Sequence, residues 1–179
     1  MKPAKFDYHA PTTVDDAVAL LAGGGDARVL AGGQTLIPMM NFRLAAPAVI
    51  VDLNRIPELA TIKDDGDTVR IGAMTRQRAV EFSPVVAEKL PLLAKAIKLV
   101  GHLPTRTRGT IGGSIANADP AAEIPMVLQA LEGQVVVRGP KGQRSIAASA
   151  LFQDAMTTAL AADEILVEIR LPTALAKAG

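Results

Sequence analysis

The residues of this sequence that could do chemistry begin with a pair of glycines, Gly32-Gly33, followed by Gln34 and Thr35. The pair lies between an expected strand and an expected helix. A turn of this kind can present consecutive backbone N–H groups to one point, which suits a phosphate oxygen. The signal is weak alone, because plain strand–helix turns also use glycine. Neither a G-x-G-x-x-G pattern nor a Walker lysine accompanies the pair.

A second glycine pair, Gly112-Gly113, lies between Thr110 and Ser114 and repeats the pattern. Two such loops can clamp a diphosphate from both sides, with the hydroxyls of Thr35, Thr110 and Ser114 as further donors. The formal charge of +1 agrees with a diphosphate that is neutralised mainly by amides. It offers no basic excess for nucleic acid. The two pairs together predict a diphosphate site, although two ordinary turns remain the alternative at this point.

Other kinds of site have less support in the sequence. The chain has no cysteine, which excludes disulfides, a cysteine nucleophile and a protein-ligated iron–sulfur cluster. His9 and His102 are isolated, so no metal site is expected. The acidic turn 64–67 resembles part of a calcium loop but lacks its downstream glutamate. Asp119 and Glu123, four residues apart, are either paired acids or helix-start residues, with capping favoured for Asp119. No catalytic residue is therefore predicted.

The elements around the first glycine pair alternate between strands and helices. Thr13 can cap a helix whose apolar residues fall on one face, and the glycines at 23–25 end it. The expected order is an extended segment at 5–8, this helix, a strand at 28–31, a helix at 36–40 and a strand at 49–53. Such alternation favours parallel pairing, so residues 1–56 are expected to form a small parallel-sheet subdomain.

The remainder, residues 57–179, is expected to form a larger subdomain with an antiparallel sheet, which makes the fold class α+β. Hairpins are expected at 61–71 and 134–146, and a final strand at 165–171. Helices are expected at 75–82, from 84, from 91 and at 125–131, with an irregular segment at 101–109. The two subdomains should pack as one body. The polar N-terminus and the lack of roughly 18 consecutive apolar residues indicate a cytoplasmic protein.

The two glycine segments, taken with their contexts, resemble one protein family. These contexts are residues 29–36, residues 108–123 and an opening Phe6-x-Tyr8-x-x-Pro11-Thr12. They are similar to the FAD-binding medium subunit of molybdenum hydroxylases, of the carbon monoxide dehydrogenase and xanthine dehydrogenase type. The resemblance extends over essentially the whole chain. It implies a PCMH-type FAD-binding fold with a small parallel-sheet and a larger antiparallel-sheet subdomain.

The resemblance also implies which residues bind FAD. It assigns the diphosphate to the two glycine segments, the ribityl or ribose hydroxyls to Glu123, and the isoalloxazine ring to Leu166 with Ile37. Gln34 stands near where relatives with covalent flavin have histidine or cysteine, so the FAD is expected to be noncovalent. The expected cofactor-binding residues are Ala31, Gly32, Gly33, Gln34, Thr35, Leu36, Ile37, Thr110, Gly112, Gly113, Ser114, Asn117, Glu123 and Leu166.

An electron-transfer role follows from the resemblance. A molybdopterin-binding large subunit would hydroxylate the substrate, and two 2Fe-2S clusters on a small subunit would pass electrons to this FAD. The electrons would leave to an acceptor such as NAD, a quinone or oxygen. The chain would thus be the oxidoreductase flavin subunit of a hetero-oligomer, without nucleic acid or a membrane span. The further C-terminal domain of family medium subunits is expected to be absent, cleaved away or on another chain.

Two other functions remain open on the sequence. One is a flavin-free binding or assembly module of the same fold. A yellow colour of the purified protein would exclude it. The other is an independent flavin reductase, such as a cell-wall sugar-nucleotide reductase. That chemistry needs a proton donor near the flavin and a nucleotide-sugar site, and the sequence offers neither. The substrate and the final acceptor are not predicted.

Overall fold

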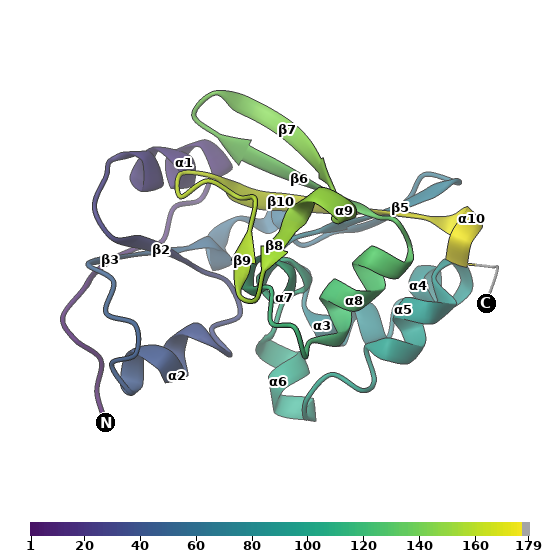
Figure 1. The fold of residues 1–179 in the computed structure, drawn as a ribbon, viewed down its shortest axis with the longest axis horizontal. Helices are drawn as coiled ribbons and strands as arrows, with labels where there is room; N and C mark the ends of the chain where they lie inside the picture. The colour runs from purple at the N-terminus through teal and green to yellow at the C-terminus, as the bar shows by residue number, and fades with distance from the viewer. Residues whose placement is uncertain (177–179) are drawn as a thin grey trace.

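Both expected sheets are present in the computed structural model, which describes residues 1–176 (Figure 1). The smaller sheet is parallel and has the strand order β1-β3-β2. Its strands are β1 (Asp7–His9), β2 (Ala27–Leu30) and β3 (Val49–Asp52), and the connections between them carry α1 (Val14–Ala22) and α2 (Leu36–Asn41). The predicted alternation of strands and helices in this part of the chain is therefore confirmed.

Local signals fix the bounds of α1. The Thr13 hydroxyl accepts a hydrogen bond from the Asp16 N–H (3.1 Å) and donates one to the Asp16 carboxylate (2.6 Å), which is the predicted cap. The helix ends at Gly23, and Gly24 and Gly25 follow with φ of +85° and +89°. Its buried residues are Ala17, Val18 and Leu21, the face that the periodicity indicates.

The larger sheet is antiparallel, with the order β4-β5-β10-β6-β7. Each of the two predicted hairpins supplies one side of it, and the last strand pairs with both β5 and β6. Helices α3 to α8 lie on one side of this sheet (Figure 1). The strands are β4 (Ile62–Asp64), β5 (Thr68–Gly72), β6 (Gln134–Gly139), β7 (Gly142–Ala147) and β10 (Ile165–Pro172).

The remaining elements are short. The helices are α3 (Gln77–Glu81), α4 (Pro84–Lys89), α5 (Pro91–Ala96), α6 (Leu103–Arg108), α7 (Ile111–Asn117), α8 (Glu123–Ala130), α9 (Ala148–Leu151) and α10 (Thr173–Ala176). Two 3-10 helices, η1 (Leu53–Arg55) and η2 (Pro57–Leu59), follow β3. A small hairpin, β8 (Phe152–Asp154) with β9 (Thr157–Thr158), occupies a segment for which the sequence predicts no element.

Two expectations about helices were wrong. The segment 101–109 is not irregular, because α6 forms within it. The Arg106 guanidinium of this helix donates to the Glu81 carboxylate (3.0 Å) and to the Val100 carbonyl (2.9 Å). Thr75 does not cap the helix that follows it. Its buried hydroxyl donates to the Thr61 carbonyl (3.0 Å) instead, and α3 starts only at Gln77. Both differences come from contacts between residues far apart in the sequence.

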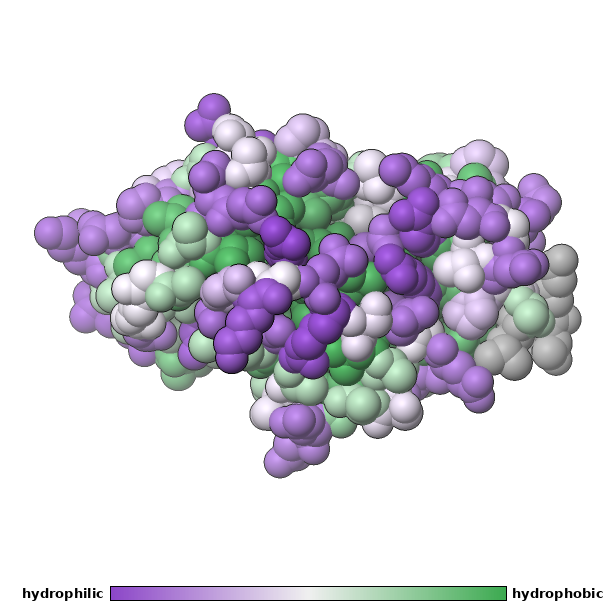
Figure 2. Space-filling model, turned by 90° about the horizontal axis from the view of Figure 1, so that it is seen from above, coloured by the Kyte–Doolittle hydropathy of each residue, from purple (hydrophilic) through white to green (hydrophobic). Residues whose placement is uncertain are grey.

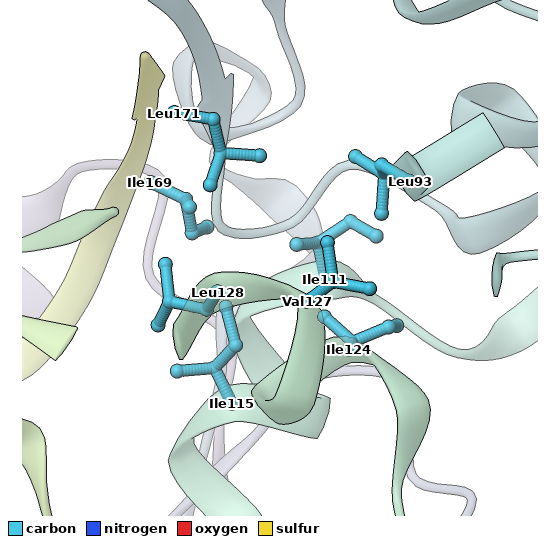
Figure 3. Close-up of a pocket in the computed structure, with 8 residues that line it drawn as sticks. All are labelled: Leu93, Ile111, Ile115, Ile124, Val127, Leu128, Ile169 and Leu171. Atoms are coloured by element: carbon cyan, nitrogen blue, oxygen red, sulfur yellow. The ribbon is translucent and has the colours of Figure 1, made fainter. Parts of the chain in front are cut away.

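Two hydrophobic cores hold the fold together. The larger one lies between the antiparallel sheet and its helices and contains a cavity of about 10 Å³. Figure 3 shows that only apolar side chains, from α5, α7, α8 and β10, surround this cavity. It is a packing gap and not a binding site, because a bound water would need polar partners. On the face shown in Figure 2, hydrophobic and hydrophilic residues are mixed over the surface.

The smaller core joins the two subdomains. It contains the buried face of α1 and residues of β3, together with Leu59, Met74 and Ile165 from the second subdomain. An ion pair between Arg138 of β6 and Asp15 of α1 (2.9 Å) adds a polar contact across the same junction. The two parts of the chain therefore pack as one body, as predicted.

Candidate functional site

The two glycine segments lie against each other in the structure. A Cβ added at Gly32 would lie 2.5 Å from the Arg108 carbonyl oxygen and 2.7 Å from the Gly109 Cα. A Cβ added at Gly113 would lie 3.4 Å from the Ala31 Cβ. The backbones can approach this closely only because Gly32 carries no side chain. The structure thus brings together the two segments that the sequence singled out.

The first segment presents a row of free amides. Within the described residues, the backbone N–H groups of Gly33, Gln34, Thr35 and Leu36 have no hydrogen-bond partner. Gly33 has φ +72°, in the left-handed region, and its carbonyl accepts from the Ile37 N–H (3.1 Å). Consecutive N–H groups around a left-handed residue form a concave site that binds anions. This segment has the chemistry that a phosphate group requires.

The second glycine pair lies in the first turn of α7 and not in a loop, which corrects the expectation. Its amides are already occupied: the Gly112 N–H donates to the Ala73 carbonyl (2.9 Å) and the Gly113 N–H to the Thr110 hydroxyl (3.1 Å). Thr110 is the N-cap of α7 and is 2% exposed. The clamp from two sides therefore cannot use the amides of Gly112 and Gly113. The hydroxyl of the half-buried Ser114 can still donate from this side.

A polar network that sequence reasoning missed connects the two segments. The Asn54 side-chain amide donates to the Ala31 carbonyl (2.9 Å), and the Arg76 guanidinium donates to the Asn54 side-chain oxygen (2.5 Å). The same guanidinium donates to the Arg108 carbonyl. Only the Asp-x-Asn pattern after a buried strand, typical of a side-chain-stabilised turn, could have pointed to Asn54. Nothing in the sequence indicated Arg76.

Charged side chains take part in this network and shift pKa values within it. Asp52 accepts from the Asn54 N–H (2.8 Å) and from the Tyr8 hydroxyl (2.5 Å). The hydrogen bond to Asp52 is the main cause that raises the pKa of Tyr8. Partial burial, followed by the positive charge of Arg108, lowers the pKa of Arg76. Two neighbouring guanidinium groups beside the glycine segments make this region attractive to an anion.

The other predicted site residues are distributed around α7 and the core. Asn117 is the last residue of α7 and donates to the Met156 sulfur (3.8 Å), while Glu123 is the first residue of α8. Ile37 is 39% exposed on α2. Leu166 is 5% exposed and belongs to the larger core, so the structure does not place it on an open surface. Its contact with an isoalloxazine ring stays a prediction.

A surface cavity of about 330 Å³ lies at the other end of α7 from its glycines. It is lined by residues that follow Asn117, by α8 and by the β8 segment, and its walls are apolar except at a few side chains such as Asp119 and Gln129. Asp119 accepts from the Ala121 N–H (2.9 Å) and so stabilises the turn before α8, whereas the N-cap position of α8 is Ala122 and has no side-chain cap. The free amides and this cavity thus lie at opposite ends of one short helix.

Two other kinds of feature are absent from residues 1–176. No group of three or more histidine, cysteine, aspartate or glutamate side chains in this range is placed to hold a metal ion. None of the helices within these residues is long and apolar enough to cross a bilayer. Anion binding at the glycine segments is therefore the chemistry that the described residues support best.

A row of free amides around a left-handed glycine, with Arg76 beside it, is an arrangement that can bind an anionic group such as a phosphate. Residues 4–174 match the family model for the FAD binding domain in molybdopterin dehydrogenase, and the chain belongs to this family. The resemblance noted in the sequence is therefore confirmed.

Relatives with known names support the same assignment. The carbon monoxide dehydrogenase medium chain of Hydrogenophaga pseudoflava is 47% identical over 173 residues, which cover 96% of this chain and 60% of the relative. The nicotine 6-hydroxylase medium subunit of Paenarthrobacter nicotinovorans is 42% identical, with coverages of 97% and 61%. The chain thus spans about three fifths of the length of these relatives.

Solved structures confirm the fold class. A structure of carbon monoxide dehydrogenase from Hydrogenophaga pseudoflava superposes with a TM-score of 0.95 at 48% identity, covering 97% of this chain and 61% of the other. Quinoline 2-oxidoreductase from Pseudomonas putida 86 gives 0.94 at 36% identity, with the same coverages. The small parallel sheet and larger antiparallel sheet are therefore those of the PCMH-type FAD-binding fold, as expected.

Proposed function

We propose that this chain binds one FAD noncovalently and carries electrons through it as the flavin part of a molybdenum hydroxylase. The observation that carries the proposal is the row of four free amides at 33–36 around the left-handed Gly33. Family membership supports FAD as the ligand of this anion site, because the diphosphate is the anionic part of FAD. The names of the relatives support the dehydrogenase role.

The residues present fit an FAD diphosphate mainly from one side. The amides at 33–36 would donate to the phosphate oxygens, with the Thr35 and Ser114 hydroxyls as further donors. Arg76 and Arg108 would add positive charge beside them. Gly112 and Gly113 would act through backbone shape and not through their amides. FAD itself would supply the redox chemistry, while this chain binds and orients it.

The rest of the cofactor is proposed to extend along α7 towards Asn117 and Glu123. The cavity beside the start of α8 lies at that end, which supports an extended ligand along the helix. Glu123 would accept hydrogen bonds from ribityl or ribose hydroxyls, and Ile37 would offer apolar surface to the ring. Gln34 has no nucleophilic atom suited to a flavin bond, so the FAD would be held by noncovalent contacts alone.

The proposed partners are a molybdopterin-binding large subunit and a small subunit with 2Fe-2S clusters. This chain has no cysteine to ligate a cluster, so electrons would have to arrive from another chain. The interface should bury at least about 1,000 Å² with an apolar centre. The cytoplasm is the proposed location of the complex.

The first test is the flavin content of the purified protein. We expect a yellow protein with one FAD per chain, which acid precipitation releases into the supernatant. Noncovalent contacts are lost on unfolding, whereas a covalent bond would keep the flavin in the pellet. A colourless protein that takes up no added FAD would favour a flavin-free module instead.

The second test concerns the partners. When the chain is tagged in its native host, we expect it to co-purify with molybdenum and iron–sulfur subunits, because the described residues show no catalytic acid–base pair or metal site of their own. The isolated chain should turn over no small substrate at enzyme-like rates. If it co-purified with nothing and oxidised or reduced a substrate alone, an independent flavoenzyme would replace this proposal.

A further inference from the structure

Arg76 belongs to none of the sequence motifs, yet its backbone is part of the second glycine segment's support. The residues on either side of it pair with this segment: the Gln77 N–H donates to the Gly109 carbonyl (2.9 Å), and the Ile111 N–H donates to the Thr75 carbonyl (3.1 Å). The main chain at Arg76 is therefore fixed relative to the start of α7.

The Arg76 side chain extends from this fixed point to the first glycine segment. Its guanidinium donates to the Arg108 carbonyl and to the Asn54 side-chain oxygen (2.5 Å), and Asn54 donates in turn to the Ala31 carbonyl (2.9 Å). The bonds form one continuous connection from Arg108, at the end of α6, to Ala31, the residue just before Gly32. The partial burial of Arg76 makes these charge-assisted hydrogen bonds stronger than exposed ones.

We infer that Arg76 is a positioning residue which, through Asn54, holds the first glycine segment against the second and so keeps the amides at 33–36 in a diphosphate-binding arrangement. The inference rests on the proposed FAD function. A guanidinium suits this task because its donors have a fixed planar geometry and can serve two acceptors at once. A lysine can form one of the two hydrogen bonds, but its ammonium lacks the planar geometry that serves both acceptors at once. Asn54 is itself oriented by Asp52, which accepts from its backbone N–H (2.8 Å).

The test is titration of the flavin-free protein with FAD in single and double variants. Arg76→Gln and Asn54→Ala should each raise the Kd for FAD about tenfold, because both remove the charge-assisted hydrogen bond between the Arg76 guanidinium and Asn54. Arg76→Lys should lie between the wild type and Arg76→Gln. Because both residues act through one connection, the double variant should bind no more weakly than the weaker single variant.

Arg78, two residues further along and within α3, provides a matched control. It pairs with Glu81 (3.2 Å) and stacks 4.2 Å from the centre of the Phe82 ring, outside the network. Arg78→Gln should therefore bind FAD as the wild type does. The melting temperature of each flavin-free variant shows whether it folds. If Arg76→Gln fails to fold, the FAD affinities of Arg76→Lys and Asn54→Ala provide the test.

The outcomes separate the two proposals. If the wild-type protein binds no FAD, the proposed function fails whatever the Arg76 variants do. If the wild type binds FAD and the folded Arg76 variants bind equally well, the positioning role of Arg76 is refuted. If the losses from Arg76→Gln and Asn54→Ala simply add, Arg76 does not act through Asn54, and the inferred connection is wrong.

Discussion

Gly32→Ala is expected to weaken FAD binding by at least about a hundredfold, the largest effect on affinity among single substitutions at the site. The new Cβ would overlap backbone atoms of Arg108 and Gly109, at 2.5 Å and 2.7 Å. Neither atom belongs to a flexible side chain that could turn away. The first segment would have to move, and the amides at 33–36 would lose their alignment with the phosphates. Titration of the flavin-free variant with FAD measures the loss.

Gly23→Ala is the matched control for this substitution. A Cβ at Gly23 would lie 3.4 Å from the Leu20 carbonyl oxygen, an ordinary contact, at the end of α1. This variant should bind FAD with wild-type affinity. If Gly32→Ala also did so, the close approach of the two segments would not shape the cofactor site, and the proposed location of the diphosphate would be wrong.

Gly112→Ala is expected to lower the free energy of unfolding by about 2–3 kcal/mol, as overpacking of a filled core site does. Its Cβ would lie 2.5 Å from the Ala73 Cβ and 2.8 Å from both the Cα and the carbonyl oxygen of Ala73. The substitution would also disturb the hydrogen bond from the Gly112 N–H to that carbonyl. Chemical denaturation of the flavin-free protein measures the change.

A second substitution tests the cause of this loss. Ala73→Gly in the Gly112→Ala background removes one of the three close contacts, so it should recover only part of the stability. The sequence motif assigns Gly112 to the FAD site, whereas its close contact with Ala73 gives it a role in the stability of the fold. Unchanged stability with a large loss of FAD affinity in Gly112→Ala would contradict the packing role.

The parts of the fold that the sequence predicted depend on local signals. The cap at Thr13, the glycines after α1 and the turns of the two hairpins each act within a few residues, and they place α1 and the paired strands correctly. The helix α6 could not be predicted in this way. Its Arg106 is held by Glu81, 25 residues earlier in the sequence.

The same division applies to the candidate site. The first glycine segment was predictable because free amides around a left-handed glycine are a property of one short stretch of chain. The amides of Gly112 and Gly113 were misjudged because an acceptor at Ala73 and the cap at Thr110 occupy them. Arg76 and Asn54 were missed because their importance comes only from their contact across 22 residues.

The central position of β10 has a consequence for the order in which the protein can be assembled. Residues 165–172 are made after the other four strands of the antiparallel sheet, yet they pair with β5 on one side and with β6 on the other. During synthesis, the edges of β5 and β6 that pair with β10 in the finished sheet stay unpaired until β10 emerges, and such edges are sites for incorrect pairing between chains. Ile165 also belongs to the core shared by both subdomains. Translation of β10 is therefore the step that joins the two hairpins into one sheet.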